Sequence, residues 1–411
     1  METETEFVPV LFAGDINVYS VARAFHEEYG VKAKAFGKAS AGVCVGSRIM
    51  DYESLPNADH GDAIVSAVNQ IAERDSGRKI IAIGCGDAYV RQISANKGRF
   101  APNVIAPYID IDLMDRLTDK EQFYGLCESL GIAYPDTFIC RKEGGYEGGF
   151  PFGGPFIIKP SDGVAYWEHP FPGQDKIYKA GSEGEAAAII SRIYGSGYEG
   201  AVVVQNFIPG DDTYMRVLTN YSDRHGKVKL TCHGHVLLEE HTPHGSGNHA
   251  VIITERNEAL ESSIIGLLEG IGYRGFSNFD IKYDRRDGKF KVFELNARQG
   301  RSNYYVTGAG ENIARYLVED LIRRRELPFK AVSKKSLWMV VPKKVAFDYV
   351  GPKQYRQEMR RLISEGSYAN PLKNPADGGA GRRLRLMKNL MSHHYKFRKY
   401  YGKQRDAGTD G

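Results

Sequence analysis

The first hundred residues alternate between short apolar runs and longer stretches in which apolar side chains recur at helical spacing. The apolar runs at 7–13, 31–36 and 79–83 are typical of buried strands. Helical spacing and capping residues predict helices at about 15–29, near 61–74 and from 87 onward. Such alternation predicts a parallel sheet with helices on its faces. Ligands of these sheets bind at the carboxyl ends of the strands.

Two of the predicted strands end in glycine-aspartate turns. The first turn reads Gly14-Asp15-Ile16-Asn17 and the second reads Gly84-Cys85-Gly86-Asp87. Neither has the third glycine of a dinucleotide-binding fingerprint. A plain turn between strand and helix and a substrate-binding turn both fit this pattern. We take Gly14, Asp15 and Asn17 as candidate substrate-binding residues.

A strong alternation farther along the chain predicts a β-hairpin. Residues 279–283 and 291–296 alternate apolar and polar side chains, and an Asp-Gly pair suits the tight connection between them. Because alternate residues of a strand share a face, Glu294 and Asn296 point the same way. Pairing of the two strands could set Asp280 opposite them.

These three polar side chains of the hairpin form a candidate metal site. Carboxylate and amide oxygens are hard ligands, and Mg²⁺ prefers one or two carboxylates together with substrate phosphates. A solvated hairpin with charged outer residues is the alternative. The apolar neighbours Phe279, Ile281, Phe293 and Leu295 favour the metal site, because polar groups on so apolar a strand are costly without a partner.

Two lysines upstream are candidate phosphate ligands. Lys159 interrupts the apolar strand predicted within 155–163, where a buried ammonium needs a partner and a phosphate group is a good one. Lys120 begins a helix predicted at about 118–131. Taken alone, Lys120 fits a surface lysine in a first helical turn.

Composition bounds the class of protein. A chain of 411 residues with 42% hydrophobic content should hold two or three domains with a real core. Its five cysteines are scattered, which argues against a disulfide framework or a zinc ribbon and favours a reducing cytosol. The acidic N-terminus lacks the apolar segment of a secretory signal. No apolar run approaches the roughly 18–20 residues that span a bilayer. We therefore expect a cytoplasmic protein.

The order of these features resembles the ATP-grasp ligases. The resemblance covers roughly residues 7–327 and rests on five motifs in the family's order: Asp119-Lys120, Phe156-Ile157-Ile158-Lys159-Pro160, the hinge Gln205-Asn206-Phe207-Ile208, Asp280, and Glu294-Leu295-Asn296-Ala297-Arg298. It implies an α/β (α+β) protein with a Rossmann-like pre-ATP-grasp domain at 1–115. A two-subdomain ATP-grasp domain at 116–330 would follow, with its hinge at about 204–212, and then a basic extension at 331–411.

The resemblance also implies roles for residues that match the motifs. The expected ATP-binding residues are Lys120, Lys159, Ser161, Gln205, Asn206, Phe207, Ile208 and Asp212. Asp280, Glu294 and Asn296 would hold two Mg²⁺ ions, for which Mn²⁺ can substitute. The segment 160–169, with Ser161, resembles the flexible loop that closes over the phosphates, although it is less rich in glycine than most.

The implied activity is ATP-dependent ligation of a carboxylate to an amine through an acylphosphate. Arg298, Arg301 and Lys159 are the expected catalytic residues, and Arg216, Arg301 and Ser302 are further candidates for binding substrate. Within the superfamily, residues 14–30 and 159–169 look most similar to D-aspartate ligase and related enzymes of peptidoglycan assembly. This implies an amino-acid carboxylate and the amine of a peptide or cell-wall precursor as partners.

Several alternatives stay open at this point. Another small-peptide ligase or a kinase could bind ATP in the same way, and a non-catalytic ATP-binding regulator could keep the fold. A zinc site among the histidines of 233–249 is conceivable, but a polar loop facing substrate is the preferred interpretation. A homodimer is also open.

The region from 381 onward is strongly basic, although the net charge of the chain is only +4. A solvated basic helix is the simplest interpretation. Peptidoglycan precursors carry pyrophosphate, and lipid-linked ones sit on an anionic membrane, where each basic residue adds about 1 kcal/mol of attraction. We therefore expect the tail to dock an anionic precursor or the inner membrane face. No nucleic-acid motif accompanies the charge, so no nucleic-acid partner is expected.

Overall fold

The computed structural model describes residues 5–40, 42–143, 149–242 and 245–405. By internal contacts the chain forms two compact units. The larger unit comprises Met1–Met114, Asp212–Asp280 and Leu295–Gly411. The smaller unit comprises Asp115–Asp211 and Ile281–Glu294.

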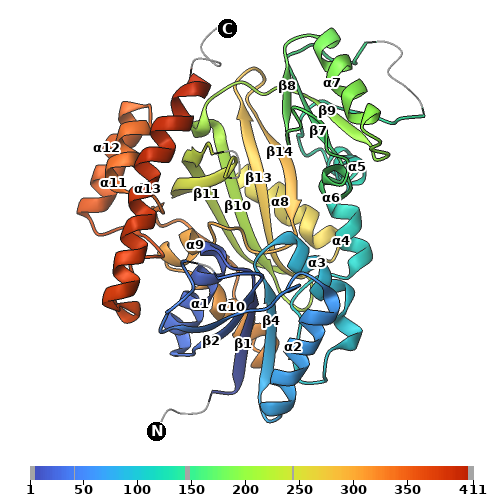
Figure 1. Cartoon of the computed structure of the whole chain (residues 1–411). Helices are drawn as coiled ribbons and strands as arrows, with labels where there is room; N and C mark the ends of the chain where they lie inside the picture. Colours follow the sequence, from blue (N-terminus) through green and yellow to red (C-terminus); the bar gives the residue numbers. More distant parts are fainter. Residues whose placement is uncertain (1–4, 41, 144–148, 243–244, 406–411) are drawn as a thin grey trace. The chain divides into compact units, whose positions relative to one another are not determined.

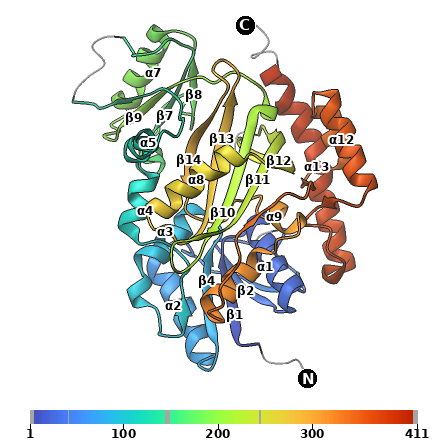
Figure 2. The same cartoon turned by 180° about the vertical axis from the view of Figure 1, so that it is seen from behind.

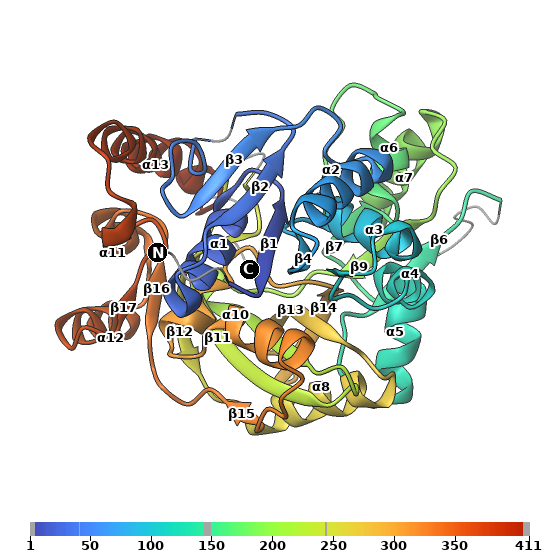
Figure 3. The same ribbon diagram turned by 90° about the horizontal axis from the view of Figure 1, so that it is seen from below.

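The larger unit contains the parallel sheet that the sequence predicts. Its strand order is β3-β2-β1-β4-β5, and every neighbouring pair is parallel. Figure 3 shows α1 on one side of this sheet and α2 and α3 on the other. The strands are β1 (Phe7–Phe12), β2 (Ala33–Gly37), β3 (Met50–Ser54), β4 (Lys79–Gly84) and β5 (Val104–Ile105). The helices are α1 (Ile16–Tyr29), α2 (Gly61–Arg74), α3 (Asp87–Ala95) and α4 (Ile111–Thr118), with a 3₁₀ turn η1 (Lys97–Arg99).

The turn after β1 is fixed by local hydrogen bonding. The Asp15 side chain accepts a hydrogen bond from the backbone N–H of Asn17 at 3.0 Å and so caps α1. Gly30 ends the helix at a φ of 67°, a left-handed conformation that glycine adopts without strain. The predicted position of this helix is confirmed.

A second, mainly antiparallel sheet has the order β14-β13-β10-β11-β12-β16-β17, with β15 beside β11. In Figures 1 and 2, α8 lies along this sheet. The predicted hairpin is β13 and β14. The strands are β10 (Met215–Ser222), β11 (Val228–Glu240), β12 (Asn248–Glu255), β13 (Gly275–Asp284), β14 (Lys289–Asn296), β15 (Lys330–Ala331), β16 (Leu337–Met339) and β17 (Tyr368–Ala369). The helices here are η2 (Asp212–Tyr214), α8 (Glu258–Gly270), α9 (Tyr304–Gly308) and α10 (Ile313–Leu317).

The helical segment that begins with α10 does not keep α-helical geometry. After α10 the chain continues as a π-helical segment, Val318–Ile322. The widened turn accompanies the burial of Asp320, whose carboxylate accepts hydrogen bonds from the Tyr221 hydroxyl at 2.8 Å and the Arg224 backbone N–H at 2.9 Å. A polar group that needs buried partners therefore competes with regular helix geometry here.

The basic C-terminal region packs into the larger unit. Strand β16 pairs with β12, and α13 (Ala380–Arg405) lies beside α11 (Lys343–Tyr349). Figure 1 shows α11, α12 (Lys353–Ser364) and α13 as neighbours. Phe397 of α13 is buried in the core that these helices share. The tail is thus more than the solvated helix that its charge alone would indicate.

A buried carboxylate ties the start of α13 to the N-terminal sheet layer. Asp377, in the turn η4 (Pro375–Asp377), accepts hydrogen bonds from the Tyr19 hydroxyl at 2.7 Å and the Ser47 hydroxyl at 2.8 Å. The Arg382 guanidinium pairs with the same carboxylate at 2.9 Å and lies over the Tyr19 ring. We call Tyr19, Ser47, Asp377 and Arg382 the Asp377 cluster.

The smaller unit is built on an antiparallel sheet of order β6-β9-β7-β8. Its core contains apolar side chains of β7, β9 and α7. Its strands are β6 (Thr137–Cys140), β7 (Phe156–Pro160), β8 (Tyr178–Ala180) and β9 (Val202–Asn206). Its helices are α5 (Lys120–Ser129), α6 (Gly163–Trp167) and α7 (Glu183–Gly195). In the part of the chain that the structure describes, no helix combines the length and apolar character needed to cross a membrane.

Candidate active site

Lys120 and Glu294 form an ion pair in the smaller unit. Asp119 caps α5 by accepting a hydrogen bond from the Gln122 backbone N–H at 2.9 Å, which makes Lys120 the first residue of the helix. The Lys120 Nζ lies 2.8 Å from Glu294 Oε2. The charge of Lys120 holds the pKa of Glu294 at about 2, against the opposing effect of burial. The carboxylate is therefore ionised throughout the physiological pH range.

Lys159 adds a second nitrogen near the same carboxylate. It lies on β7 beside Ile158, which is fully buried. Burial lowers the pKa of Lys159 to about 7, and repulsion from Lys120 acts in the same direction, whereas Glu294 opposes both. A lysine held near neutrality beside another ammonium is poised to take up a proton when an anion arrives.

The predicted hinge lies at the end of β9. The Gln205 amide donates hydrogen bonds to the hydroxyls of Tyr124 and Thr137, both at 2.9 Å. The Asn206 amide donates to the Gly153 carbonyl at 2.6 Å. The backbone N–H groups of Asn206 and Phe207 donate to protein carbonyls at 2.9 and 2.8 Å. Because these two N–H groups already have protein acceptors, an adenine base bound at this segment would form its hydrogen bonds with other groups of the hinge.

Two lysines flank the Phe207 ring in the smaller unit. The Lys179 Nζ lies 4.3 Å from the ring centroid and the Lys282 Nζ 5.4 Å. Ile208, the next residue, is buried. The ring is thus held between cations and presents a fixed apolar surface at the hinge.

The segment expected to be a flexible phosphate loop contains the short helix α6. Tyr166 of α6 is fully buried, and its hydroxyl donates to the Asp175 carbonyl at 2.9 Å and lies 2.6 Å from the Tyr178 hydroxyl. Just before α6, the Ser161 hydroxyl lies 3.4 Å from that of Tyr198. Tyr166 anchors this segment to the core, a feature absent from a plain glycine-rich loop.

In the larger unit, Asp280 and Asn296 lie in contact. The Asn296 Nδ2 donates to Asp280 Oδ2 at 3.0 Å, and the Asn296 Oδ1 accepts from Arg298 at 3.3 Å. Glu294 precedes Asn296 by two positions on β14, and alternate residues of a strand share a face. Two carboxylates and an amide oxygen fit the ligand chemistry of Mg²⁺. Among the described residues, no group of three or more His, Cys, Asp or Glu side chains is arranged to hold a metal.

Arg298 is held by a bidentate pair. Its Nε and Nη2 lie 2.7 and 2.9 Å from the two carboxylate oxygens of Asp87. Asp87 opens α3 directly after β4, so the structure brings the hairpin's arginine to the predicted carboxyl end of a parallel strand. Bidentate pairing fixes the orientation of the guanidinium plane, in addition to balancing its positive charge.

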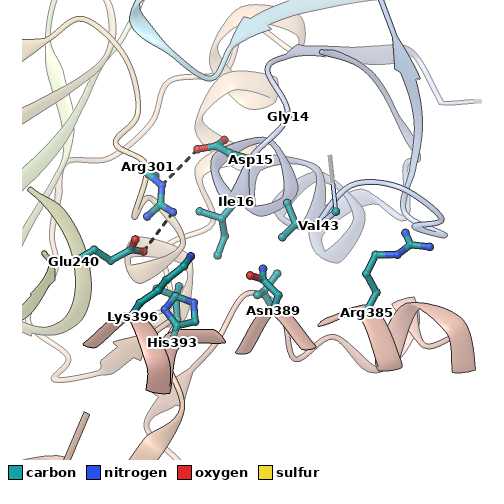
Figure 4. Close-up of a pocket in the computed structure, with 13 residues that line it drawn as sticks. Gly14, Asp15, Ile16, Val43, Glu240, Arg301, Arg385, Asn389, His393 and Lys396 are labelled. Atoms are coloured by element: carbon teal, nitrogen blue, oxygen red, sulfur yellow. Dashed lines mark ion pairs between the residues drawn. The ribbon is translucent and has the colours of Figure 1, made fainter. Parts of the chain in front are cut away.

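Arg301 meets the turn after β1, where the sequence predicts substrate binding. The Arg301 Nε lies 3.5 Å from Asp15 Oδ2, and its Nη2 lies 3.6 Å from Glu240 Oε1. These residues and Gly14 line a cavity of about 350 Å³ (Figure 4). The structure thus groups three of the candidate substrate residues, Gly14, Asp15 and Arg301.

Three other candidates for substrate binding are buried or mostly buried within protein networks. The Asn17 amide donates to the Cys85 carbonyl at 2.9 Å and accepts from Asn303 at 2.7 Å. Ser302 is buried. Arg216 pairs with Glu255 at 2.9 Å. Asn17 and Arg216 are thus held by protein partners.

Asp212 and its neighbour His241 belong to the histidine-rich region. The Asp212 Oδ2 accepts the Glu239 backbone N–H at 2.9 Å and lies 2.9 Å from His241 Nε2. His244, considered earlier as a zinc ligand, lies outside the described residues. Asp212 is therefore held in place by protein partners.

Sequence reasoning missed the cavity wall that α13 supplies. Its lining residues are Arg385, Asn389, His393 and Lys396. Their spacing of four, four and three positions places them on one face of a helix, which was the available signal. Glu240 of β11 was also missed, because nothing in its local sequence distinguishes it.

The chain is similar to a known ligase over nearly its whole length. The chain is 38% identical over 412 residues to D-aspartate ligase from Enterococcus faecium (strain Aus0004), covering 96% of this chain and 97% of that protein. No protein-family model matches the chain. The match spans both compact units.

Solved structures share the fold at low sequence identity. The ADP complex of N5-carboxyaminoimidazole synthetase from Staphylococcus aureus has a TM-score of 0.58 at 13% identity, covering 86% of each chain. L-amino acid ligase from Bacillus licheniformis has a TM-score of 0.53 at 14% identity, covering 78% of this chain and 75% of that one. These proteins are ATP-grasp enzymes, so the predicted fold is confirmed.

Proposed function

Because the chain belongs to the D-aspartate ligase family of ATP-grasp enzymes, it is an ATP-dependent carboxylate–amine ligase, and we propose that it joins D-aspartate to the amine of a peptidoglycan precursor peptide. The observation that carries this proposal is the 38% identity over 96% of the chain. Lys120 and Lys159, the cationic groups near Glu294, also support it, because they can pair with the phosphate oxygens of ATP. We also propose that the enzyme works in the cytoplasm.

The reaction needs activation of the amino-acid carboxylate, because oxide is a poor leaving group. The γ-phosphoryl group of ATP moves to a carboxylate oxygen and ADP departs, which leaves an acylphosphate. The amine then attacks the acyl carbon, loses a proton, and phosphate leaves as the amide forms. Positioning and charge neutralisation supply most of the catalysis in such phosphoryl transfers.

The chain's own residues can supply these functions. Lys120 and Lys159 would neutralise phosphate oxygens, for which their convergence near Glu294 is the support. Arg298, oriented by Asp87, would stabilise the transferred phosphoryl group and the later oxyanion. Arg301 would hold a substrate carboxylate.

The nucleotide contacts follow the family's pattern. We assign the adenine to the hinge segment 205–208, the ribose to Asp212 and phosphate contacts to Ser161. Asp280, Glu294 and Asn296 would hold two Mg²⁺ ions, with Mn²⁺ able to replace them. Bound metal would offset the negative charge of the phosphates.

ADP release tests the function directly. With ATP and Mg²⁺, wild-type protein should release ADP only when both D-aspartate and an amine-bearing precursor peptide are present. L-aspartate, asparagine and serine are the comparison substrates. ADP release with an acceptor but no amino acid would indicate a kinase, and nucleotide binding without turnover would indicate a regulator. Either result would contradict the proposal.

Nucleotide binding should take up a proton at Lys159. Since its pKa is lowered to about 7, roughly three quarters of Lys159 is neutral at pH 7.5, and phosphate oxygens should restore its charge. Calorimetric titration with a non-hydrolysable ATP analogue, in two buffers of different ionisation enthalpy, measures the uptake. It should vanish below about pH 6, where Lys159 is already protonated.

The Lys159→Arg variant is the control for this uptake, because arginine stays charged at every pH used. It should bind the analogue with the Lys159 component of proton uptake removed. Equal uptake in the two proteins at pH 7.5 would contradict the assignment.

We further propose that the exposed face of α13 rests on an anionic membrane surface. Leu384, Met387, Met391 and Tyr395 follow one another at helical spacing, and each is more than half exposed. Exposed basic residues, Arg383, Lys388, Arg398 and Lys399, occur along the same helix. Apolar and basic side chains on one exposed helix suit a surface of anionic lipid.

Substitution of this face should reduce binding to anionic vesicles. The variant Met387→Glu/Met391→Glu should sediment with phosphatidylglycerol vesicles several-fold less than wild type, and wild type should not sediment with phosphatidylcholine vesicles. Phe329→Glu is the control, because Phe329 is an exposed apolar residue on another segment. Equal sedimentation of all three proteins would contradict the proposal.

A further inference from the structure

The cavity beside Arg301 is closed on one side by α13. The turn after β1 contributes Gly14, Asp15 and Ile16, and one face of α13 contributes a polar wall. In Figure 4, Arg301 lies between Asp15 and Glu240, and His393 and Lys396 lie close to this group. The wall faces residues from the start of the chain, far from α13 in sequence.

We propose that this cavity holds the amino-acid substrate and that Lys396 binds its second carboxylate, which makes α13 the wall that selects a dicarboxylic amino acid. This inference rests on the proposed ligase function and adds the residues that determine specificity. It assigns to the basic tail a role inside the enzyme, separate from any surface that its opposite face contacts.

The charges of the lining residues complement such a substrate. Asp15 and Glu240 can face an ammonium group, while Arg301, Arg385 and Lys396 can face carboxylates. The lining thus carries one more cationic than anionic side chain. A dicarboxylic amino acid carries one ammonium and two carboxylates, so its net charge is the opposite. Complementary charge favours this substrate over a neutral amino acid.

Arg301 is loosely held in this structure. Its contacts with Asp15 and Glu240, at 3.5 and 3.6 Å, are longer than the 2.7–2.9 Å typical of charge-assisted hydrogen bonds. By contrast, Arg298 makes bidentate contacts at 2.7 and 2.9 Å. A carboxylate entering the cavity can therefore take a close contact with Arg301 without displacing a tight ion pair.

His393 supplies an independent sign of a ligand. Its side chain is 9% exposed, and its Nδ1 has no hydrogen-bond partner among the described residues. Burial lowers its pKa to about 4, with help from Lys396 and Arg301, so the ring is neutral at pH 7. A buried ring nitrogen without a partner is costly, and a ligand in the cavity can satisfy it.

The wall is fixed before any ligand enters. The Asp377 cluster holds the start of α13, and Arg385 donates to the Val45 carbonyl at 2.8 Å. Phe397, one position after Lys396, is buried in the core shared with α11. Lys396 is thus carried on a rigid element, which suits a residue that discriminates between substrates.

A substrate that lacks the second carboxylate would leave a charged side chain of the cavity unpaired, and this energetic cost is the source of specificity. In asparagine an amide replaces the second carboxylate, so Lys396 in the cavity would lack a charged partner. Removing the lysine charge should therefore weaken aspartate more than asparagine. A variant that is merely misfolded would weaken both equally.

The test uses the full-length Lys396→Met variant, which keeps most of the apolar stem and loses the charge. Binding of D-aspartate, L-aspartate and D-asparagine is measured by calorimetry with an ATP analogue and Mg²⁺ present, and KM is measured in the ADP-release assay. We expect the Kd and KM for the preferred aspartate to rise about tenfold or more, with the preference over asparagine largely lost. The KM for ATP should change less than twofold.

Lys353→Met is the matched control, because Lys353 is an exposed lysine at the start of the neighbouring helix α12. It should match wild type in every measurement. Unchanged aspartate binding in Lys396→Met, or an equal loss for aspartate, asparagine and ATP, would overturn the inference. Wild-type protein that binds neither aspartate nor asparagine would instead show that the proposed function itself is wrong.

Discussion

Replacing Glu294 by glutamine should lower turnover by at least about 100-fold while leaving the protein folded. Glutamine keeps the shape of the side chain but removes the charge that pairs with Lys120 at 2.8 Å. In the proposed site the same carboxylate is a metal ligand, so the variant loses a ligand and leaves two lysines without their anionic partner. Charge balance of this kind dominates phosphoryl transfer.

The measurement is kcat for ADP release at saturating ATP and amino acid, with the melting temperature checked in parallel. Glu258→Gln is the control, because Glu258 is a mostly exposed glutamate in the first turn of α8. It should keep wild-type turnover. A Glu294→Gln enzyme within threefold of wild type would exclude Glu294 from the metal and phosphate chemistry.

Replacing Arg298 by alanine should lower kcat by about 10²–10³-fold, the usual effect of removing one preorganised donor from a developing negative charge. The guanidinium is fixed by Asp87 and also contacts Asn296, so it is rigidly presented next to this candidate metal ligand. Its loss should affect kcat more than the KM for ATP, because the charge it stabilises develops in the transition state.

Asp87→Asn separates this role from a structural one. Asparagine can still accept a hydrogen bond from Arg298, so the arginine stays near its position while the ion pair is lost. We expect less than a tenfold loss of kcat in this variant. If Asp87→Asn were as damaging as Arg298→Ala, the ion pair itself would be the essential feature, and the proposed contact of Arg298 with the phosphoryl group would lose its support.

Local sequence was sufficient where structure depends on near neighbours. The sequence predicts a helix near 61–74, and α2 spans Gly61–Arg74, because its apolar face and flanking turns are encoded within it. The hairpin likewise follows from alternation around an Asp-Gly connection, and Gly288 takes the positive φ that this turn requires. The pairing of Lys120 with Glu294 was not deduced from spacing, and only the family resemblance placed both residues at one phosphate site.

The features that the sequence did not predict depend on contacts between distant segments. The spacing of residues 385–396 marks a polar helix face, but nothing local says which part of the molecule that face meets. The π-helical turn at Asp320 similarly depends on Tyr221 and Arg224, about a hundred positions earlier. The flexible loop expected at 160–169 rests on the family resemblance alone, whereas the structure buries Tyr166 against Phe171, Tyr178 and Tyr198.

The Asp377 cluster can form only late in synthesis, because its members lie far apart in the sequence. Tyr19 and Asp377 are 358 positions apart, which at about 5–20 residues per second separates their appearance from the ribosome by roughly 20–70 seconds. In that interval the N-terminal sheet can form, but the cavity beside Arg301 stays open on the side that α13 later covers. Selectivity is therefore among the final properties that the nascent molecule acquires, and a transcript truncated before residue 380 would encode a protein that lacks this wall.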